Sequence, residues 1–413
     1  MSKTVRIVLY ILSILTVLGV LAALLTTGSA GRARRTMQQG NQPFAESGQS
    51  AQDKDLDASF AVGETESQEA GDGQSAQTQE SEISSTADGT GQSEDVEQER
   101  VTSDGDTTIL FAGDVLLAHR AVAAGYDANG LDGVIAPELQ RELQSADILM
   151  VNNEFAFSDR GAPVADKQYT FACSPTYVKV LSEMGVDVVT LANNHTLDYG
   201  KDALRDTFET LDNAGILYGG AGETVERAQE VQMIEVNGRT YGFLAVSRVI
   251  PSVDWKVENS APGIFSCYDD TRLLELIREA KEKCDFLAVY PHWGVEREAY
   301  PEDYQIRIAQ RCIEAGADMI VGAHSHCLQG VSYIEGKPVF YSMGNFIFGY
   351  TNEQSAVLKV TVDADGNASF RYIPVYAAGG VTYLADGEKS AQICQYIDSI
   401  SEASVGADGA VAE

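Results

Sequence analysis

Apolar positions recur along this chain with two different spacings, and each spacing predicts a different kind of element. Short continuous apolar runs bounded by glycine, proline or asparagine predict buried strands, while Leu204, Phe208 and Leu211 follow the spacing of one helix face. By these criteria strands are expected at 108–112, 147–151, 186–192, 286–290 and 319–323, and helices at 137–144, 175–184, 199–213, 271–283 and 304–314.

Glycine-containing turns join three further pairs of apolar runs. Asn237 and Gly238 suit the left-handed conformations of a type I′ turn, so a hairpin is expected between 231–236 and 241–246. Two more hairpins are expected around 335–337 and 365–366, and a helix is expected over 391–400. Repeated strand and helix signals followed by antiparallel hairpins predict a layered α/β fold with mixed sheets.

The first hundred residues have a different pattern. Residues 7–25 are uncharged and mostly apolar, follow Lys3 and Arg6, and are just long enough to cross a bilayer as a helix. Because the apolar part of a cleaved signal peptide is usually shorter, we expect an uncleaved single-pass anchor with the folded domain outside the cytoplasm. Residues 36–105 hold sixteen acidic side chains against Lys54 and Arg100, with few large apolar residues, and this predicts a disordered linker.

These patterns divide the chain into four parts. We expect a membrane anchor with basic flanks (1–35), a disordered acidic linker (36–105), an α/β domain (106–378) and a C-terminal helix and tail (379–413), with 404–413 frayed. The formal net charge of −32 argues against nucleic acid or an anionic membrane surface as the main partner. The six cysteines show no Cys-x-x-Cys spacing and are too dilute for a disulfide scaffold.

Four of the five histidines stand at the carboxyl ends of apolar runs: His195, His292, His324 and His326. Ligands of open α/β sheets gather beyond the carboxyl ends of the strands, so these imidazoles are expected to converge. Extended residues point to the same side at every second position, and His324 and His326 are therefore expected to direct both rings to one spot. The fifth, His119, is interpreted as a residue that binds no metal.

Carboxylate and amide side chains follow the same apolar runs. Asp114 and Glu154 end the first two runs, and Asn194 directly precedes His195. Oxygen and imidazole ligands together suit one or two divalent ions of manganese, iron or zinc. With Asp114 or Glu154 as a bridge, two ions about 3.5 to 4 Å apart would activate a water for hydrolysis. Asp114 and Asp198 also suit helix N-caps, and Glu296 suits a solvated loop.

Six short motifs occur in order between about residues 107 and 375. They are Gly113-Asp114, Asn152-Asn153-Glu154, Ala192-Asn193-Asn194-His195, His292-Trp293-Gly294, Gly322-Ala323-His324-Ser325-His326 and Ser342-Met343-Gly344-Asn345-Phe346. In this order they resemble the CapA family of bacterial poly-gamma-glutamate capsule biosynthesis proteins. The resemblance implies a calcineurin-like metallophosphoesterase fold, a four-layer α/β/β/α sandwich.

The resemblance also implies roles for single residues. It implies that His195 is the general acid, oriented by Asp198. This sequence differs at one point from the wider phosphoesterase pattern, in which a histidine stands two residues after the aspartate. Here Val115 and Leu116 follow Asp114. The difference predicts weaker binding of the first metal ion. The metal ligands that the resemblance implies are Asp114, Glu154, Asn194, His292, His324 and His326.

As a whole, the resemblance implies a membrane-anchored extracytoplasmic protein of capsule polymer biosynthesis or export with a metal-dependent, phosphoesterase-like hydrolytic site. The expected partners are an anionic capsule polymer or a phosphoester substrate, the membrane, and other capsule synthesis proteins. Two alternatives stay open from the sequence. One is a non-catalytic scaffold that binds and exports the polymer, and the other is an exported metallophosphatase unrelated to capsule.

Overall fold

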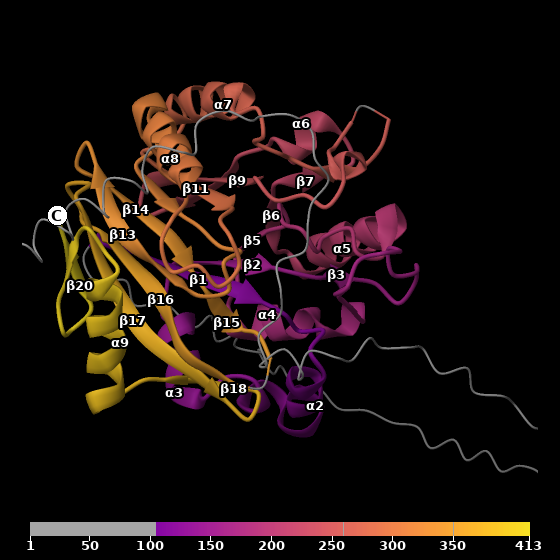
Figure 1. Cartoon of the computed structure of the whole chain (residues 1–413), viewed down its shortest axis with the longest axis horizontal. Coiled ribbons are helices and arrows are strands. Elements are labelled where there is room, and N and C mark those ends of the chain that lie inside the picture. The colour runs from indigo at the N-terminus through magenta and orange to yellow at the C-terminus, as the bar shows by residue number, and fades with distance from the viewer. Residues whose placement is uncertain (1–104, 259, 350) are drawn as a thin grey trace, which may run out of the picture. The chain divides into compact units, whose positions relative to one another are not determined.

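The structure is a computed structural model that describes residues 105–413, except for residues 259 and 350 (Figure 1). The expected anchor at 7–25 and all but the last residue of the expected linker at 36–105 lie outside the described residues. Within the described part of the chain, no helix is both long enough and apolar enough to cross a membrane.

The first of two large sheets is half parallel and half antiparallel, with ten strands among the described residues. Its parallel half consists of β1 (Thr107–Val115), β2 (Ile148–Asn153), β5 (Val188–Thr190), β6 (Leu217–Gly219) and the short β15 (Asn345–Ile347). Its antiparallel half consists of β16 (Asn352–Val362), β17 (Ala368–Ala378), β18 (Val381–Leu384), β19 (Ser404–Val405) and β20 (Ala410–Ala412).

The second large sheet has a parallel centre closed by a hairpin on each edge. Its strands, in spatial order, are β13 (Leu328–Ile334), β14 (Lys337–Met343), β12 (Met319–Val321), β11 (Phe286–His292), β9 (Arg239–Ser247) and β8 (Gln232–Val236). Asn237 and Gly238 have φ values of 51° and 73°, and Glu335 and Gly336 have 51° and 72°. These two of the three expected hairpins are therefore confirmed, with the positive φ values of a type I′ turn, and the third joins β16 and β17 of the first sheet.

Alternation along the central strands builds the layers. On β1, Leu110 and Ala112 pack into a core shared with helices, whereas Ile109 and Phe111 pack into the core between the two sheets. Helices α2 (Arg120–Asn129), α3 (Pro137–Gln144), α4 (Val178–Met184) and α5 (Gly200–Ala214) cover the outer face of the first sheet, and α7 (Thr271–Lys281) and α8 (Asp303–Ala315) cover that of the second (Figure 1). The expected mixed α/β architecture is confirmed.

Short elements connect these layers. They are β3 (Ala156–Phe157) paired with β4 (Ala172–Cys173), β7 (Ala221–Gly222) paired with β10 (Gly263–Ile264), the single-turn helix α6 (Val225–Ala228), and 3-10 turns at Gly130–Gly133, Pro175–Tyr177 and Val253–Trp255. Helix α2 escaped the sequence analysis because only Val122 and Ala123 of its residues are buried, too few to give a helical pattern.

The expectation of a frayed C-terminal tail is wrong. Helix α9 (Gly387–Ser399) begins before the expected 391, and the residues after it form β19 and β20. Strand β20 adds to the edge of β17, where Phe370 pairs with Val411, and Val405 is buried in the inter-sheet core. The tail is ordered because it covers an edge strand and buries apolar surface.

The two sheets meet beneath one edge at which parallel strands of both sheets end. The Tyr290 hydroxyl on β11 donates to the Ala112 carbonyl oxygen on β1 at 3.0 Å. The Asp114 backbone N–H donates to the Gly344 oxygen at 2.9 Å, and a β-carbon built on Gly113 would lie only 1.8 Å from that oxygen. Glycine at 113 is thus what lets the two chain segments approach and places Asp114 at the common edge.

We predict that Gly113→Ala lowers the free energy of unfolding by about 3 kcal/mol, because the added methyl group meets rigid backbone and forces β1 away from Gly344. Denaturant unfolding measures this change. Gly219→Ala on β6 of the same sheet is the matched control, since its β-carbon would meet Ala245 at an ordinary 3.4 Å. Equal effects of the two substitutions would contradict the prediction.

Candidate metal centre

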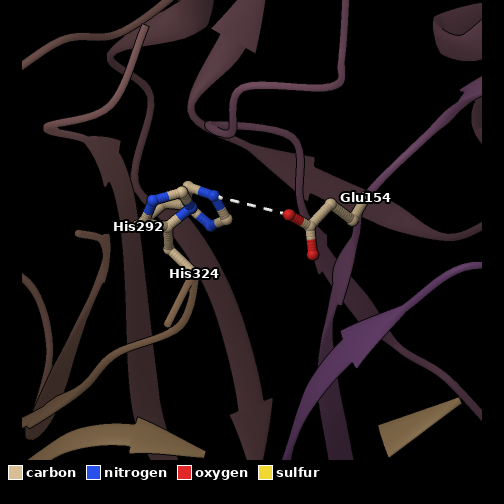
Figure 2. A group of neighbouring side chains, drawn as sticks. All are labelled: Glu154, His292 and His324. Atoms are coloured by element: carbon tan, nitrogen blue, oxygen red, sulfur yellow. Dashed lines mark ion pairs between the residues drawn. The ribbon is translucent and has the colours of Figure 1, made fainter. Parts of the chain in front are cut away.

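Two groups of potential metal ligands share one carboxylate. Glu154 forms one group with His292 and His324 and a second group with Asp114 and His326, and within each group the ligand atoms lie within 4.8 Å of one another. Figure 2 shows Glu154 extending from the end of β2 toward the two imidazoles of the first group. The first sheet therefore supplies the carboxylates and the second sheet supplies the imidazoles.

His324 and His326 converge for a different reason from the one that the sequence suggested. Strand β12 ends at Val321, and both histidines lie beyond it with positive φ values of 97° and 54°, so they are not alternate residues of an extended segment. Such conformations cost of order 1–3 kcal/mol each and persist where the surroundings enforce them. Here the buried Ser325 between them accepts from the Arg297 backbone N–H at 2.8 Å and donates to the Cys327 oxygen at 2.8 Å.

Asn152, which is not among the ligands expected from the sequence, connects them. Its Nδ2 donates to Asp114 Oδ1 at 2.8 Å and lies 3.4 Å from both Glu154 Oε2 and His292 Nδ1. Its Oδ1 accepts from Asn193 Nδ2 at 3.0 Å. Asn152 therefore orients members of both groups. Its place in the Asn152-Asn153-Glu154 motif, at the end of β2, is the sequence feature that could have indicated this role.

Two asparagine oxygens complete the cluster. Asn194 Oδ1 lies 2.8 Å from His292 Nε2, and Asn345 Oδ1 lies 2.9 Å from His326 Nδ1, which is also 3.1 Å from Asp114 Oδ2. All six residues proposed as ligands from the sequence thus lie in one neighbourhood. Asn345, known from the sequence only as part of a motif, lies there with them.

The donor set fits divalent cations because it holds acceptor atoms that no described residue satisfies. Glu154 is fully buried and its Oε1 has no hydrogen-bond partner among the residues that the structure describes, and the same is true of His324 Nδ1. An unsatisfied buried polar atom costs about 1–3 kcal/mol. Carboxylate oxygen and imidazole nitrogen are also the ligands that manganese, iron and zinc accept.

Burial disturbs the ionisation of these groups in the ion-free protein. It raises the pKa of Glu154 well above its usual range, and the nearby charge of Asp114 adds to this. Burial and the neighbouring imidazoles hold the pKa values of His292 and His324 well below the usual range. Burial acts in the same direction on His326, but hydrogen bonding to Asp114 outweighs it and the pKa of His326 is raised. A bound cation would favour the charged carboxylate and the neutral imidazoles together.

His195 and Asp198 form a separate pair beside the cluster. His195 Nδ1 lies 2.7 Å from Asp198 Oδ2, which also accepts from the Phe171 backbone N–H at 2.8 Å. Lys167 completes the arrangement, since its Nζ contacts Asp198 Oδ1 and lies 3.1 Å from His195 Nδ1. Burial lowers the pKa of His195 and the charge of Lys167 lowers it further. No sequence pattern singles out Lys167, because it stands alone in a polar loop between β3 and β4.

The structure also decides several alternatives left by the sequence. Asp114 continues β1 rather than capping a helix, and α5 begins at Gly200 with Tyr199 as its N-cap, so Asp198 is not a cap. Glu296 is exposed in a loop and belongs to neither group of ligands.

Two further positions bear on the number of ligands. His119 is the N-cap of α2, where its Nδ1 accepts from the Ala121 N–H, and it belongs to neither group. Leu116, at the position of the histidine in the wider pattern, is fully buried in the apolar core. The group that contains Asp114 therefore receives no imidazole from β1.

Comparisons with known proteins agree on one family. A model of the family described as "Bacterial capsule synthesis protein PGA_cap" matches residues 108–350. The "PGA biosynthesis protein CapA" of Bacillus subtilis is 30% identical over 278 residues, which cover 66% of this chain and 72% of that protein. The "Capsule biosynthesis protein CapA" of Bacillus anthracis is 34% identical over 221 residues, which cover 51% of this chain and 53% of that protein. The chain thus spans about half the length of the second relative.

Among solved structures, the similarities are distant. The NAD nucleotidase NadN of Haemophilus influenzae matches with a TM-score of 0.44 and 15% identity, over 72% of this chain and 63% of that one. The sulfate thiohydrolase SoxB of Thermus thermophilus matches with a TM-score of 0.40 and 13% identity, over 66% of this chain and 57% of that one.

We predict that Glu154→Gln weakens Mn²⁺ binding at both groups, because Glu154 belongs to each. His324→Ala and Asp114→Asn should each weaken one group only. Loss of an outer partner of a metal ligand already costs about 10–100-fold in affinity, so loss of a ligand should cost at least as much. Calorimetric titration with Mn²⁺ and metal analysis after dialysis measure the affinity and the stoichiometry.

The exposed carboxylate of Glu296 provides the matched control for this experiment. Glu296→Gln removes one negative charge, as Glu154→Gln does, but Glu296 belongs to neither group of ligands. A titration in which Glu296→Gln and Glu154→Gln lose equal affinity would contradict the assignment of Glu154 as the shared ligand.

Proposed function

Because the chain belongs to the PGA_cap family of bacterial capsule synthesis proteins, we propose that it takes part in making or exporting an anionic capsule polymer of the poly-gamma-glutamate type. The names of the Bacillus relatives, which refer to PGA and to capsule biosynthesis, support this polymer class. In the proposal, residues 7–25 form a single-pass anchor that holds the folded domain on the outer side of the cell membrane, where a capsule is assembled. The apolar pattern of 7–25 supports the anchor.

We further propose that the domain is a metal-dependent hydrolase with the layered fold of the metallophosphoesterases. The observation that carries this proposal is the buried Glu154, which is shared by two ligand groups at the common edge of two facing sheets. One or two divalent ions held by Asp114, Glu154, Asn194, His292, His324 and His326 would supply Lewis-acid activation of water and of an ester or related oxygen.

The residues of the chain itself would position the substrate and move the proton. Asp198 holds Nδ1 of His195, and the Nε2 atom is therefore the one left to meet a leaving group as a general acid. Lys167 lies on Asp198 and balances its charge within a buried site. Phe171 and Phe348, which lie 4.5 Å and 4.6 Å from the rings of His195 and His326, form apolar walls that limit access of bulk water.

A non-catalytic scaffold is the second candidate, and one observation favours it. Leu116 leaves the group of Asp114, Glu154 and His326 with a single imidazole, so two-ion catalysis has fewer ligands than in the wider phosphoesterase pattern. A scaffold of this kind would retain the site to bind polymer carboxylates through the bound ion.

We predict that the full-length chain, purified in detergent, hydrolyses p-nitrophenyl phosphate in the presence of Mn²⁺ and stops after chelation. His324→Ala should abolish turnover, and His195→Ala should reduce kcat by about 10²–10⁴-fold, the usual contribution of a general acid. Because the lowered pKa of His195 makes its protonated form scarcer as pH rises, turnover by the unmodified chain should fall with rising pH, and His195→Ala should lose this dependence.

The remaining histidine supplies the control for this assay. His119→Asn keeps a residue that can cap α2 and should leave turnover unchanged. Metal binding without any turnover would favour the scaffold instead, and a His195→Ala variant with an unaltered pH profile would remove His195 from the mechanism.

We predict that loss of the metal site also reduces capsule polymer in a capsule-forming bacterium that carries this chain. Replacing its genomic copy with the His324→Ala variant should reduce cell-surface polymer to the level of a deletion strain if hydrolysis or metal binding is needed. Measurement of surface and released polymer, with immunoblotting to confirm equal protein, checks this. Normal polymer in the deletion strain would indicate a phosphatase that is unrelated to capsule.

A further inference from the structure

Arg248 lies at the same sheet edge as the metal centre. It directly follows β9, and the register of β9 with β11 places Ser247 opposite the candidate ligand His292. The Arg248 backbone N–H donates to the His292 oxygen at 2.9 Å. The residue is therefore anchored to the strand end that carries a metal ligand.

Two tyrosine rings hold the Arg248 guanidinium. Its central carbon lies 3.6 Å from the ring centroid of Tyr268 and 5.2 Å from that of Tyr304. The Tyr304 hydroxyl is itself fixed, since it accepts from the Gly294 N–H at 2.6 Å and donates to the Gly294 oxygen at 3.2 Å. Because Gly294 lies two residues after His292, the loop that leaves the metal centre also positions the ring beside Arg248.

The polar edge of this guanidinium has no partner among the described residues. Within the part of the chain that the structure describes, Arg248 makes no ion pair and no side-chain hydrogen bond. Arg311, in contrast, binds Asp270 at 2.6 Å, and Arg160 binds Asp206. Stacking uses the faces of a guanidinium and leaves its N–H groups available in a planar fork, which matches the two oxygens of a carboxylate or phosphate.

A second cation increases the positive charge at this position. Lys256 Nζ lies 5.7 Å from the ring centroid of Tyr268, so Arg248 and Lys256 both approach the same half-exposed ring. In a chain with a formal net charge of −32, two cations at one ring form a local concentration of positive charge. Such a concentration of positive charge favours an anionic ligand over a neutral one.

We propose that Arg248, held by Tyr268 and Tyr304, is a binding residue for an oxyanion of the substrate, and that this oxyanion is a pendant α-carboxylate or a terminal carboxylate of a γ-linked glutamate polymer. The inference rests on the proposed function, since it places one carboxylate of the polymer on Arg248 while the reacting group lies at the metal centre. The rings fix the fork before the ligand arrives, so less side-chain freedom is lost on binding.

Calorimetric titration of the full-length, Mn²⁺-loaded chain in detergent with a γ-linked glutamate oligomer tests this proposal. Arg248→Gln should weaken binding by about 10–100-fold, and Arg248→Lys should recover only part of the loss, because lysine keeps the charge but not the planar fork. Tyr268→Phe keeps the ring and should bind normally, whereas Tyr268→Ala should weaken binding although Arg248 is still present.

Arg278→Gln is the matched control, since Arg278 is exposed on α7 and its replacement changes the net charge equally. Thermal unfolding and Mn²⁺ stoichiometry of each variant separate a loss of binding from a loss of structure. If the unmodified chain binds the oligomer and folded, metal-loaded Arg248→Gln binds it equally well, the role of Arg248 is refuted while the proposed function stands.

A second arm with inorganic phosphate separates the two sources of an oxyanion. If the unmodified chain fails to bind the glutamate oligomer but binds phosphate in an Arg248-dependent way, the polymer assignment of both proposals is refuted and Arg248 is a phosphate-binding residue. If neither probe binds, the carboxylate site is refuted.

Discussion

The structure depends on the full burial of the Glu154 carboxyl group against Asp114 and three imidazoles. Packing of apolar side chains cannot satisfy the polar atoms of such a buried group. Protein atoms satisfy only part of this cluster, since Glu154 Oε1 has no hydrogen-bond partner among the described residues. Protonation of Glu154 relieves the charge at the expense of a carboxylate ligand, whereas a divalent cation would relieve it and keep the carboxylate as a ligand. The site is thus built for an ion, and the surrounding fold holds it in a geometry that is unfavourable without one.

The fold holds this geometry with rigid contacts close to each ligand. Gly113 allows β1 to approach Gly344, and the Tyr290 hydroxyl ties the end of one sheet to the other directly beneath the ligands. Ser325 fixes the left-handed turn that carries His324 and His326. Strain in that turn is tolerable because the two apolar cores on either side of the second sheet are extensive and buried. Stability of the sheets is therefore what maintains the precision of the site.

The sequence was sufficient to predict the layers and the members of the cluster, because both follow from short-range patterns. Buried parallel strands appear as continuous apolar runs, and the residue after each run lies at the common edge. The sequence did not predict features that depend on contacts between residues distant in the chain, or on an unusual backbone conformation. Nothing local indicates the positive φ of His324, the reach of Lys167 to Asp198, or the pairing of Val411 with Phe370 that orders the C-terminal tail. Leu116 is an instructive intermediate, since the departure from the wider pattern was visible but its burial in the core was not.

The candidate site also differs from the rest of the chain in its electric charge. A polyanion is repelled by a chain of net charge −32, and the exposed Glu296 near the ligands adds to that repulsion. Attraction must therefore be local, because surface charges farther away than about 8 Å are screened at physiological ionic strength. Lys167 on Asp198 and Arg248 between its two tyrosines supply positive charge at this edge of the sheets, and the proposed metal ions would add to it. Lys167 is neutralised by Asp198, whereas Arg248 makes no ion pair within the described part of the chain, so Arg248 is the fixed charge best able to select an anionic substrate.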